Sequence, residues 1–375
     1  MIYTAPEIAG NLAAKLEQLN ELRSALRSEV ERPGRWMGSL RREVRASSIQ
    51  GSTSIEGFSV EPGEAIALAG GAEAAGDDGN RMAVSCYARA MDHVGVMAED
   101  PTFRWSDRVI LDLHFDACYF QRSEDPGHWR RGPVVVTGPE GQVEYRGPDA
   151  EQVPGLMAEV VESLVGGDRE IDVIVRAAIA HLNVISVHPF RDGNGRVSRI
   201  VQSLVLARER MLSPEFSSIE EYLGANTGAY YEALRETQAG SYQPDRDATG
   251  WVSFCVDAHF EQARQRLRQV DEAAARWDFL ERQVADRGWP DRLVIALEQS
   301  LVGHADRTTY AEEANISTAT ASADFKRLLD SGLVEQTGKA RSTRYLASQK
   351  LKADLGGRVA TVRPSRAPPQ VRRRE

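Results

Sequence analysis

Apolar residues recur at three- and four-residue intervals along much of this chain, which places them on one face of an α-helix. Leu12, Leu16 and Leu19, for example, begin such a row within residues 1–45. The spacing therefore predicts a mainly α fold. Helices are expected at about residues 80–98, 106–121, 149–164, 171–186, 219–223, 227–234 and 251–285, whereas residues 65–80, rich in glycine and alanine, are expected to form a loop.

A different pattern marks the segment between residues 134 and 145. Val134, Val135 and Val136 are β-branched, a turn rich in glycine and proline follows, and a second short run ends at Tyr145. Two such runs around a turn predict a small β-hairpin.

Residues 290–347 show a third pattern, three short predicted helices followed by two strands. Ser317 is placed to cap the third helix. The order resembles a winged helix-turn-helix, in which the third helix and the wing contact DNA. Domains of this kind also serve in protein contacts alone, so both uses stay open. The candidate DNA-binding residues are Lys326, Arg327, Lys339, Arg341 and Arg344.

Composition narrows the class of protein. The 375 residues are 42% hydrophobic and 27% charged with a formal net charge of −9, as expected for an ordinary globular protein and not for a general polyanion binder. Three dispersed cysteines argue against a disulfide scaffold or a zinc site. We expect a cytoplasmic protein, because no signal peptide and no apolar run of about 20 residues is seen.

The densest chemistry lies at residues 188–199, His-Pro-Phe-Arg-Asp-Gly-Asn-Gly-Arg-Val-Ser-Arg. His188 is a candidate general base, and Asp192 is an oxygen ligand of the kind that Mg²⁺ accepts beside phosphates. A glycine turn that leads into an apolar helix through Leu206 exposes backbone N–H groups at a helix N-terminus, which is an anion site. Arg196 and Arg199 lie on one face of that helix.

This stretch resembles the signature of the Fic family, His-Pro-Phe-x-Asp/Glu-Gly-Asn-Gly-Arg-x-x-Arg, at every defined position. The resemblance implies a helical Fic core that transfers AMP from ATP, with Mg²⁺, to a Tyr, Thr or Ser hydroxyl of a target protein or of itself. His188 would be the base and Asp192 the metal ligand. ATP and its phosphates would contact Arg191, Gly193, Asn194, Gly195, Arg196 and Arg199, with Tyr230 and Tyr231 as candidates for the adenine.

Residues 46–57, taken alone, predict a polar helix start or a loop. Beside the signature they resemble the family's inhibitory motif, Ser/Thr-x-x-x-Glu-Gly/Asn, here Ser52, Glu56 and Gly57. The resemblance implies that Glu56 pairs with Arg199 and occupies the place of the γ-phosphate. It also implies that the hairpin at Val134, Val135 and Val136 is a flap that aligns the target's backbone.

The predicted organisation is an N-terminal helical region (1–100), a catalytic core (101–245), a helical linker (246–289), the winged helix (290–347) and a basic, disordered tail (348–375). Two other functions remain open. One is a DNA-binding transcriptional regulator whose Fic core senses nucleotide. The other is a hydrolase in which Glu56 activates water to remove AMP. The sequence does not decide whether the chain forms a homodimer.

Overall fold

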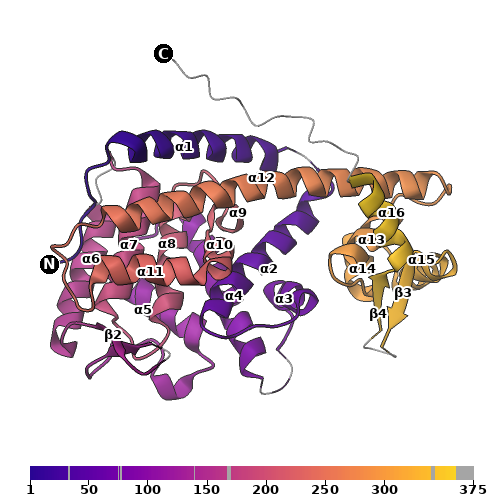
Figure 1. Ribbon diagram of the computed structural model, residues 1–375. Helices are drawn as coiled ribbons and strands as arrows, with labels where there is room; N and C mark the ends of the chain where they lie inside the picture. The colour runs from indigo at the N-terminus through magenta and orange to yellow at the C-terminus, as the bar shows by residue number, and fades with distance from the viewer. Residues whose placement is uncertain are drawn as a thin grey trace, which may run out of the picture. The chain divides into compact units, whose positions relative to one another are not determined.

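The computed structural model describes residues 1–32, 34–74, 76, 78–138, 140–166, 170–338 and 343–359, with the backbone alone for 357–359 (Figure 1). The described part is mainly helical, as predicted. It divides into two compact units, Met1–Glu29 with Val44–Arg266, and Val30–Glu43 with Leu267–Glu375. No helix among the described residues is both long and apolar enough to cross a membrane.

Helix α7 (Val173–Val187) forms the centre of the first unit. Its sequence is apolar almost all round, and nearly all of its side chains are buried, as expected for a helix enclosed by others. The helices that pack around it in one hydrophobic core are α5 (Asp107–Cys118), α6 (Val153–Gly166), α8 (Asn194–Arg208), α11 (Thr227–Gln238) and the first part of α12 (Thr249–Ala285).

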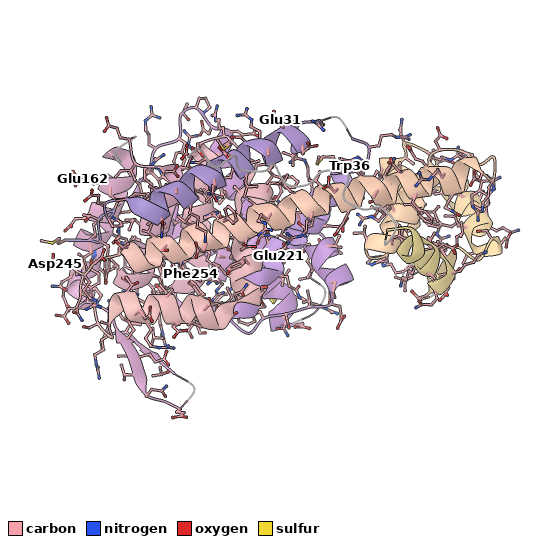
Figure 2. All side chains as sticks on the ribbon, turned by 45° about the horizontal axis from the view of Figure 1, so that its top comes forward. Glu31, Trp36, Glu162, Glu221, Asp245 and Phe254 are labelled. Carbon is pink, nitrogen blue, oxygen red and sulfur yellow. The ribbon has the colours of Figure 1, made fainter. Side chains whose placement is uncertain are left out.

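Helix α12 contributes aromatic residues to this core. Trp251 donates a hydrogen bond from Nε1 to Ala178 O at 2.7 Å, and its ring lies 5.8 Å from that of Phe254. Figure 2 labels Phe254 on α12. Arg266, also on α12, is fully buried and pairs with Glu221. Residues of the predicted linker therefore pack together with the predicted catalytic core.

The N-terminal region differs from its prediction in two places. Residues 46–55 are the second half of α2 (Met37–Ile55), and residues 62–69 form α3 (Pro62–Ala69), where a loop was predicted from residue 65. Ala65 and Leu68 are buried beside α4 (Gly79–Glu99), and this burial explains why the short segment is helical. The first helix is α1 (Gly10–Val30).

The predicted hairpin is present. Strands β1 (Val135–Thr137) and β2 (Val143–Arg146) pair antiparallel, with Val136 opposite Tyr145. Tyr145 is buried and donates a hydrogen bond to Ser186 O, so the hairpin is attached to the end of α7. Short elements complete the unit: η1 (Arg122–Glu124), η2 (Ala150–Gln152), α9 (Pro214–Ser217) and α10 (Glu220–Ala225).

The second unit has the predicted order of elements, α13 (Leu293–Val302), α14 (Arg307–Glu313), α15 (Thr318–Asp330), β3 (Val334–Thr337) and β4 (Arg344–Ala347). Ser317 Oγ accepts a hydrogen bond from Thr320 N at 3.1 Å, as expected of a cap. Phe325 stacks on Tyr345 with ring centroids 3.9 Å apart. The winged-helix interpretation itself stays a prediction.

The predicted disordered tail begins with a helix, α16 (Gln349–Val359). Leu351 is fully buried in the core of the second unit, and its N–H donates to Ser348 Oγ at 3.2 Å. Burial of Leu351, packing of Leu355 and one cap therefore accompany a helix in a segment whose composition indicated disorder. The rest of the tail, like Lys339 and Arg341, lies outside the described residues.

Candidate active site

His188 ends α7 in a left-handed conformation, with a φ of 51°. Its Nδ1 lies 3.1 Å from Ile185 O. Since a carbonyl oxygen only accepts, Nδ1 carries the proton and Nε2 keeps its lone pair. Burial lowers the pKa of His188 to about 4. The hydrogen bond with the Ile185 carbonyl raises this pKa, but its effect is smaller than that of burial. The imidazole is therefore neutral at pH 7 and can accept a proton at Nε2.

Asn194 closes the turn between α7 and α8. Its Oδ1 accepts from Phe190 N at 2.8 Å, and its Nδ2 donates to Phe190 O at 2.9 Å. The side chain is buried, and one lone pair and one N–H of its amide are used within the turn, while its contact with phosphate stays a prediction.

His114 of α5 holds the same turn from outside and was not singled out from the sequence. Its Nδ1 accepts from Gly127 N at 2.8 Å, so Nε2 carries the proton and donates to Asp192 O at 3.0 Å. The ring stacks on Phe190 at 3.6 Å. Burial lowers the pKa of His114 to about 4. The sequence feature that could have identified His114 is its position on the apolar face of a predicted helix.

Arg196 and Asp192 form an ion pair at the start of α8, with Nη2 2.9 Å from Oδ2. Arg196 is 1% exposed, and the same nitrogen donates to Gln121 Oε1 at 2.6 Å. Arg191, in contrast, has an exposed side chain that pairs with Glu124 at 2.9 Å. These two arginines, both predicted to contact phosphate, thus differ in their surroundings.

Arg199 is 1% exposed and meets the predicted inhibitory motif. Its Nε donates to Ser52 Oγ at 2.7 Å, and its Nη2 donates to Glu56 Oε1 at 2.7 Å. Burial would lower the pKa of Arg199, but the Glu56 carboxylate holds that pKa above its usual value. Nη1 is buried and has no hydrogen-bond partner in the described part of the chain.

Two glycines permit this arrangement. A Cβ at Gly195 would lie 2.5 Å from Glu56 Oε1, so a side chain there would displace the carboxylate. Gly57, with a φ of 84°, makes the turn directly after Glu56. The close approach of Glu56 to the start of α8 therefore depends on the absence of a side chain at Gly195, and the turn after Glu56 depends on the positive φ of Gly57.

The two tyrosines that were predicted as candidates to contact the adenine differ in their exposure to solvent. Tyr230 is 1% exposed, and its hydroxyl lies 3.0 Å from His181 Nε2 in the core, so this ring is not available to a ligand face-on. Tyr231 is 41% exposed, with its ring 5.3 Å from that of Tyr230. His181 is buried and also contacts Gln202, which agrees with the structural role predicted for it.

Arg130 links the hairpin to His188 and was also missed from the sequence. Its Nε donates to His188 O at 2.8 Å, and its Nη2 donates to Pro148 O at 2.6 Å. The rings of Tyr145 and His188 are 6.4 Å apart. The hairpin is thus fixed next to the candidate base, while Val135 on β1 is 45% exposed.

The described residues contain no group of three or more His, Cys, Asp or Glu side chains that could hold a metal ion alone. Mg²⁺, however, is commonly held by one or two carboxylates together with substrate phosphates. Asp192, with its side chain 41% exposed at the turn, fits that requirement.

Comparison with known proteins agrees with this geometry. Residues 105–206 match the Fic/DOC family. A probable protein adenylyltransferase of Aquifex aeolicus is 31% identical over 116 residues, which is 31% of this chain and 32% of that protein. The protein adenylyltransferase fic-1 of Caenorhabditis elegans is 38% identical over 74 residues, 20% of this chain and 13% of the relative.

Solved structures show the same fold. A Fic family protein from Desulfovibrio desulfuricans is similar with a TM-score of 0.59 and 22% identity, covering 92% of this chain and 99% of that one. A C. elegans Fic-1 fragment has a TM-score of 0.54 and 22% identity, covering 69% and 73%. Residues 105–206 of this chain therefore form a Fic domain. Its matched segments span about a third or less of the curated relatives described above.

Proposed function

We propose that this chain is a protein adenylyltransferase, which transfers AMP from ATP to a hydroxyl of a target protein or of itself. The observation that carries the proposal is the pairing of a neutral His188, with its lone pair on Nε2, and two buried arginines on the helix that begins six residues later. The names of the two curated relatives support the same activity.

His188 acts on the attacking group. Nε2 takes the proton from a Tyr, Thr or Ser hydroxyl while the oxygen of that hydroxyl forms a bond to the α-phosphorus of ATP. The bond from this phosphorus to the bridging oxygen breaks, and pyrophosphate leaves. Ile185 O orients the imidazole and Arg130 holds the backbone carbonyl of His188, so little reorganisation is needed at the moment of transfer.

The start of α8 receives the phosphates. Its N-terminal N–H groups and Arg196 face the place where a polyphosphate would bind, and the unpartnered Nη1 of Arg199 would gain a phosphate oxygen. Asp192 and the α- and β-phosphates would hold Mg²⁺, which offsets negative charge. Tyr231 is the accessible aromatic ring for the adenine.

The hairpin is proposed to bind the target. Val134 precedes β1, and the strand Val135–Thr137 pairs with β2 on one side. A target peptide added along β1 would be aligned by main-chain hydrogen bonds, with its hydroxyl near His188.

Glu56 is proposed to inhibit the transfer. Its carboxylate occupies one hydrogen-bonding nitrogen of Arg199, and Ser52 occupies another. ATP bound while these contacts persist would lack the γ-phosphate contact, so its α-phosphate would be poorly aligned. The same carboxylate favours a second function, the hydrolytic removal of AMP, if it activates water.

For the second unit we propose weak, salt-dependent DNA contact. Ser317 begins α15, and Lys326 and Arg327 are exposed on it. Arg344 on β4 is also partly exposed, with its Nη1 4.0 Å from Asp306. Helix and strand cations at this position can contact phosphates of duplex DNA.

Intact-mass analysis after incubation with ATP and Mg²⁺ tests the main proposal. One added AMP on the Glu56→Gly variant, and none on Glu56→Gly with His188→Ala, is the expected result. Parallel incubations with GTP, CTP and UTP determine the nucleotide. No mass gain with any nucleotide, alone or with candidate target proteins, would contradict transfer.

A further inference from the structure

Two glycines bring the proposed inhibitory segment, residues 52–57, into contact with α10. Gly51 lies on α2 directly before Ser52, and Gly224 lies on α10. A Cβ at Gly51 would lie 2.4 Å from Glu220 O, and a Cβ at Gly224 would lie 2.6 Å from Gly51 O. These neighbours are backbone atoms, which cannot rotate away as the end of a side chain can. The two helices therefore meet at a distance that only glycine allows.

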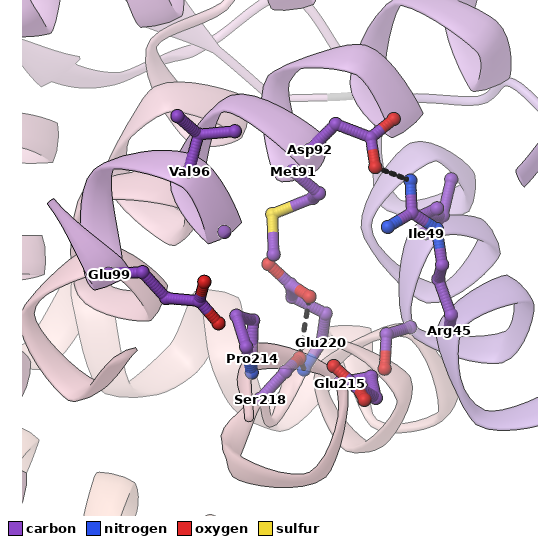
Figure 3. Close-up of a pocket in the computed structure, with 12 residues that line it drawn as sticks. Arg45, Ile49, Met91, Asp92, Val96, Glu99, Pro214, Glu215, Ser218 and Glu220 are labelled. Carbon is purple, nitrogen blue, oxygen red and sulfur yellow. Dashed lines mark hydrogen bonds and ion pairs between the residues drawn. The ribbon is translucent and has the colours of Figure 1, made fainter. Parts of the chain in front are cut away.

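Helix α10 is held to the helix that carries Arg199. Glu220, at the start of α10, is 1% exposed, and its Oε1 accepts from Ser203 of α8 at 3.2 Å and from Tyr87 of α4 at 2.7 Å. Figure 3 shows a further hydrogen bond between Glu220 and Ser218. Ser203 follows Arg199 by about one helical turn. Buried hydrogen bonds therefore set the position of α10 relative to Arg199.

A methyl group at this contact would separate α2 from α10. A carbon atom needs about 3.5 Å from its neighbours, so the two helices would have to part by about 1 Å. A cavity of about 310 Å³, lined by Ile49 of α2 and by Glu220, leaves room beside α2 for that movement (Figure 3). Arg199 donates to Ser52 Oγ and to Glu56 Oε1 at 2.7 Å each, and hydrogen bonds of this kind extend only to about 3.2 Å. The separation would therefore weaken both contacts.

We propose that Gly51 and Gly224 are positioning residues, which set how closely Ser52 and Glu56 approach Arg199. This inference rests on the proposed inhibition by Glu56, and it adds that a backbone contact maintains the inhibition together with the carboxylate. Both glycines act through the position of α2 and not on the reacting groups. A larger residue at either position therefore relieves the inhibition and leaves the transfer step intact.

The test uses the full chain and three alanine variants. Gly51→Ala and Gly224→Ala each introduce the methyl group, from opposite sides of the contact. Gly38→Ala is the matched control, because Gly38 lies on the same helix as Gly51 and a Cβ there would meet only the end of the Arg42 side chain, at 3.7 Å. Gly51→Ala and Gly38→Ala both replace a glycine of α2 with a better helix former, so the clash is what distinguishes them.

Intact mass after incubation with ATP and Mg²⁺ measures AMP incorporation. Gly51→Ala and Gly224→Ala should each incorporate AMP at least about tenfold faster than the wild type, since a misplacement of about 1 Å is enough for such an effect. Gly38→Ala should equal the wild type. In a Glu56→Gly background the same alanines should change the rate by less than about twofold, because the inhibitor is already absent. A role in folding alone would instead lower the rate in both backgrounds.

Calorimetry gives a second readout that needs no transfer. In a His188→Ala background, Gly51→Ala should raise the affinity for ATP more than the affinity for ADP. The reason is that ADP lacks the γ-phosphate, which the released Nη2 of Arg199 would contact. Gly38→Ala should leave the ratio of the two affinities unchanged.

Wild-type rates in both Gly51→Ala and Gly224→Ala, beside a faster Glu56→Gly, would overturn the positioning role and leave the proposed function in place. A Glu56→Gly variant no faster than the wild type would contradict the inhibition and this inference with it. If no variant incorporates AMP, the proposed transfer fails, and an unchanged ratio of ATP to ADP affinity in Gly51→Ala would separately overturn the inference. Thermal unfolding shows whether each variant is folded, and loss of the fold in both alanine variants would assign the two glycines to folding alone.

Discussion

Helices α8 and α15 each begin just after a turn and each carry two basic residues that were predicted to contact phosphate, but these residues differ in their exposure to solvent. On α8, Arg196 and Arg199 are both 1% exposed and contact carboxylates. On α15, Lys326 and Arg327 are exposed. Exposure is the ordinary state of a cation, whereas burial costs several kcal/mol unless partners are built around it. Buried cations therefore point to a site far more strongly than exposed ones.

The largest effect should come from the base next to α8. In a Glu56→Gly background, His188→Ala should lower the rate of AMP transfer on the order of 10²–10⁴-fold, because general-base catalysis is lost. ATP affinity should change little, since Nε2 acts on the hydroxyl and holds no phosphate. Transfer is measured by intact mass and ATP binding by calorimetry. A rate like that of the parent would exclude His188 as the base.

Release of Arg199 should give the next largest effect. Glu56→Gly frees Nη2 for the nucleotide, and since a misplacement of about 1 Å costs on the order of 10²-fold, AMP incorporation should rise by up to that factor. Glu61→Gly, at an exposed carboxylate nearby, should have no effect. Arg199→Ala should not reproduce the gain, because a phosphate ligand is lost with the inhibitor's partner.

If Glu56→Gly is no faster than wild type, Glu56 is not an inhibitor. Slower removal of AMP from a modified protein by this variant would assign the carboxylate to hydrolysis.

The turn before α8 should depend on one amide. Asn194→Ala leaves the N–H and C=O of Phe190 buried without their partner, at about 1–3 kcal/mol for each group. The free energy of unfolding should fall accordingly in urea titrations. A loss below about 0.5 kcal/mol would show that water or the backbone replaces the amide.

Acid should lower the free energy of unfolding of the first unit, because its buried histidines are neutral in the folded state. Burial lowers the pKa of His114 to about 4 and that of His181 to about 3, whereas an unfolded histidine titrates near 6.5. Their contribution to stability is complete above about pH 6.5. It is lost as the pH falls toward the pKa values of these histidines in the folded protein. Each group adds up to about 1.4 kcal/mol per pH unit. His114→Gln should flatten the dependence of the unfolding free energy between pH 6.5 and 4.

The smallest effect on the fold should come from α15. Replacing Lys326 and Arg327 with Ala should change stability by less than about 0.5 kcal/mol, because both are exposed. DNA affinity should nevertheless fall, and the slope of its logarithm against log salt should decrease by about 0.9 for each lost contact. Gel shifts at several salt concentrations measure this, and an unchanged slope would remove α15 from the DNA interface.

Local sequence patterns were sufficient to predict most of the helices and strands. Apolar spacing predicted α4, α5, α7 and α8, and β-branched runs predicted the hairpin. Helix α16 was not predicted, because Leu351 and Leu355 pack in the core of the second unit and composition alone contains no such information. The end of α2 was missed for a similar reason, since its polar residues face Arg199 and other buried groups.

Residue patterns alone predicted the site only for the consecutive residues 188–199. The contact between Ser52 and Arg199 joins positions 147 residues apart, and only the resemblance to a family motif suggested it. His114 and Arg130 each bond a backbone carbonyl of the signature, and any polar side chain could do so, so neither their type nor their spacing marked them. The two hydrogen bonds between the Asn194 amide and the backbone of Phe190 were not predicted, because an amide in a glycine turn suits either a phosphate or the backbone.

Ser52, Glu56 and Arg199 belong to one chain and one compact unit, and this sets the kind of control that proposed inhibition would exert. A tethered carboxylate acts at an effective concentration of about millimolar or more, independent of dilution. Making more of the protein would therefore neither strengthen nor relieve the inhibition. The rate of transfer would respond to the concentration of ATP, or to a partner that moves the end of α2. Each molecule would be inhibited independently of the others.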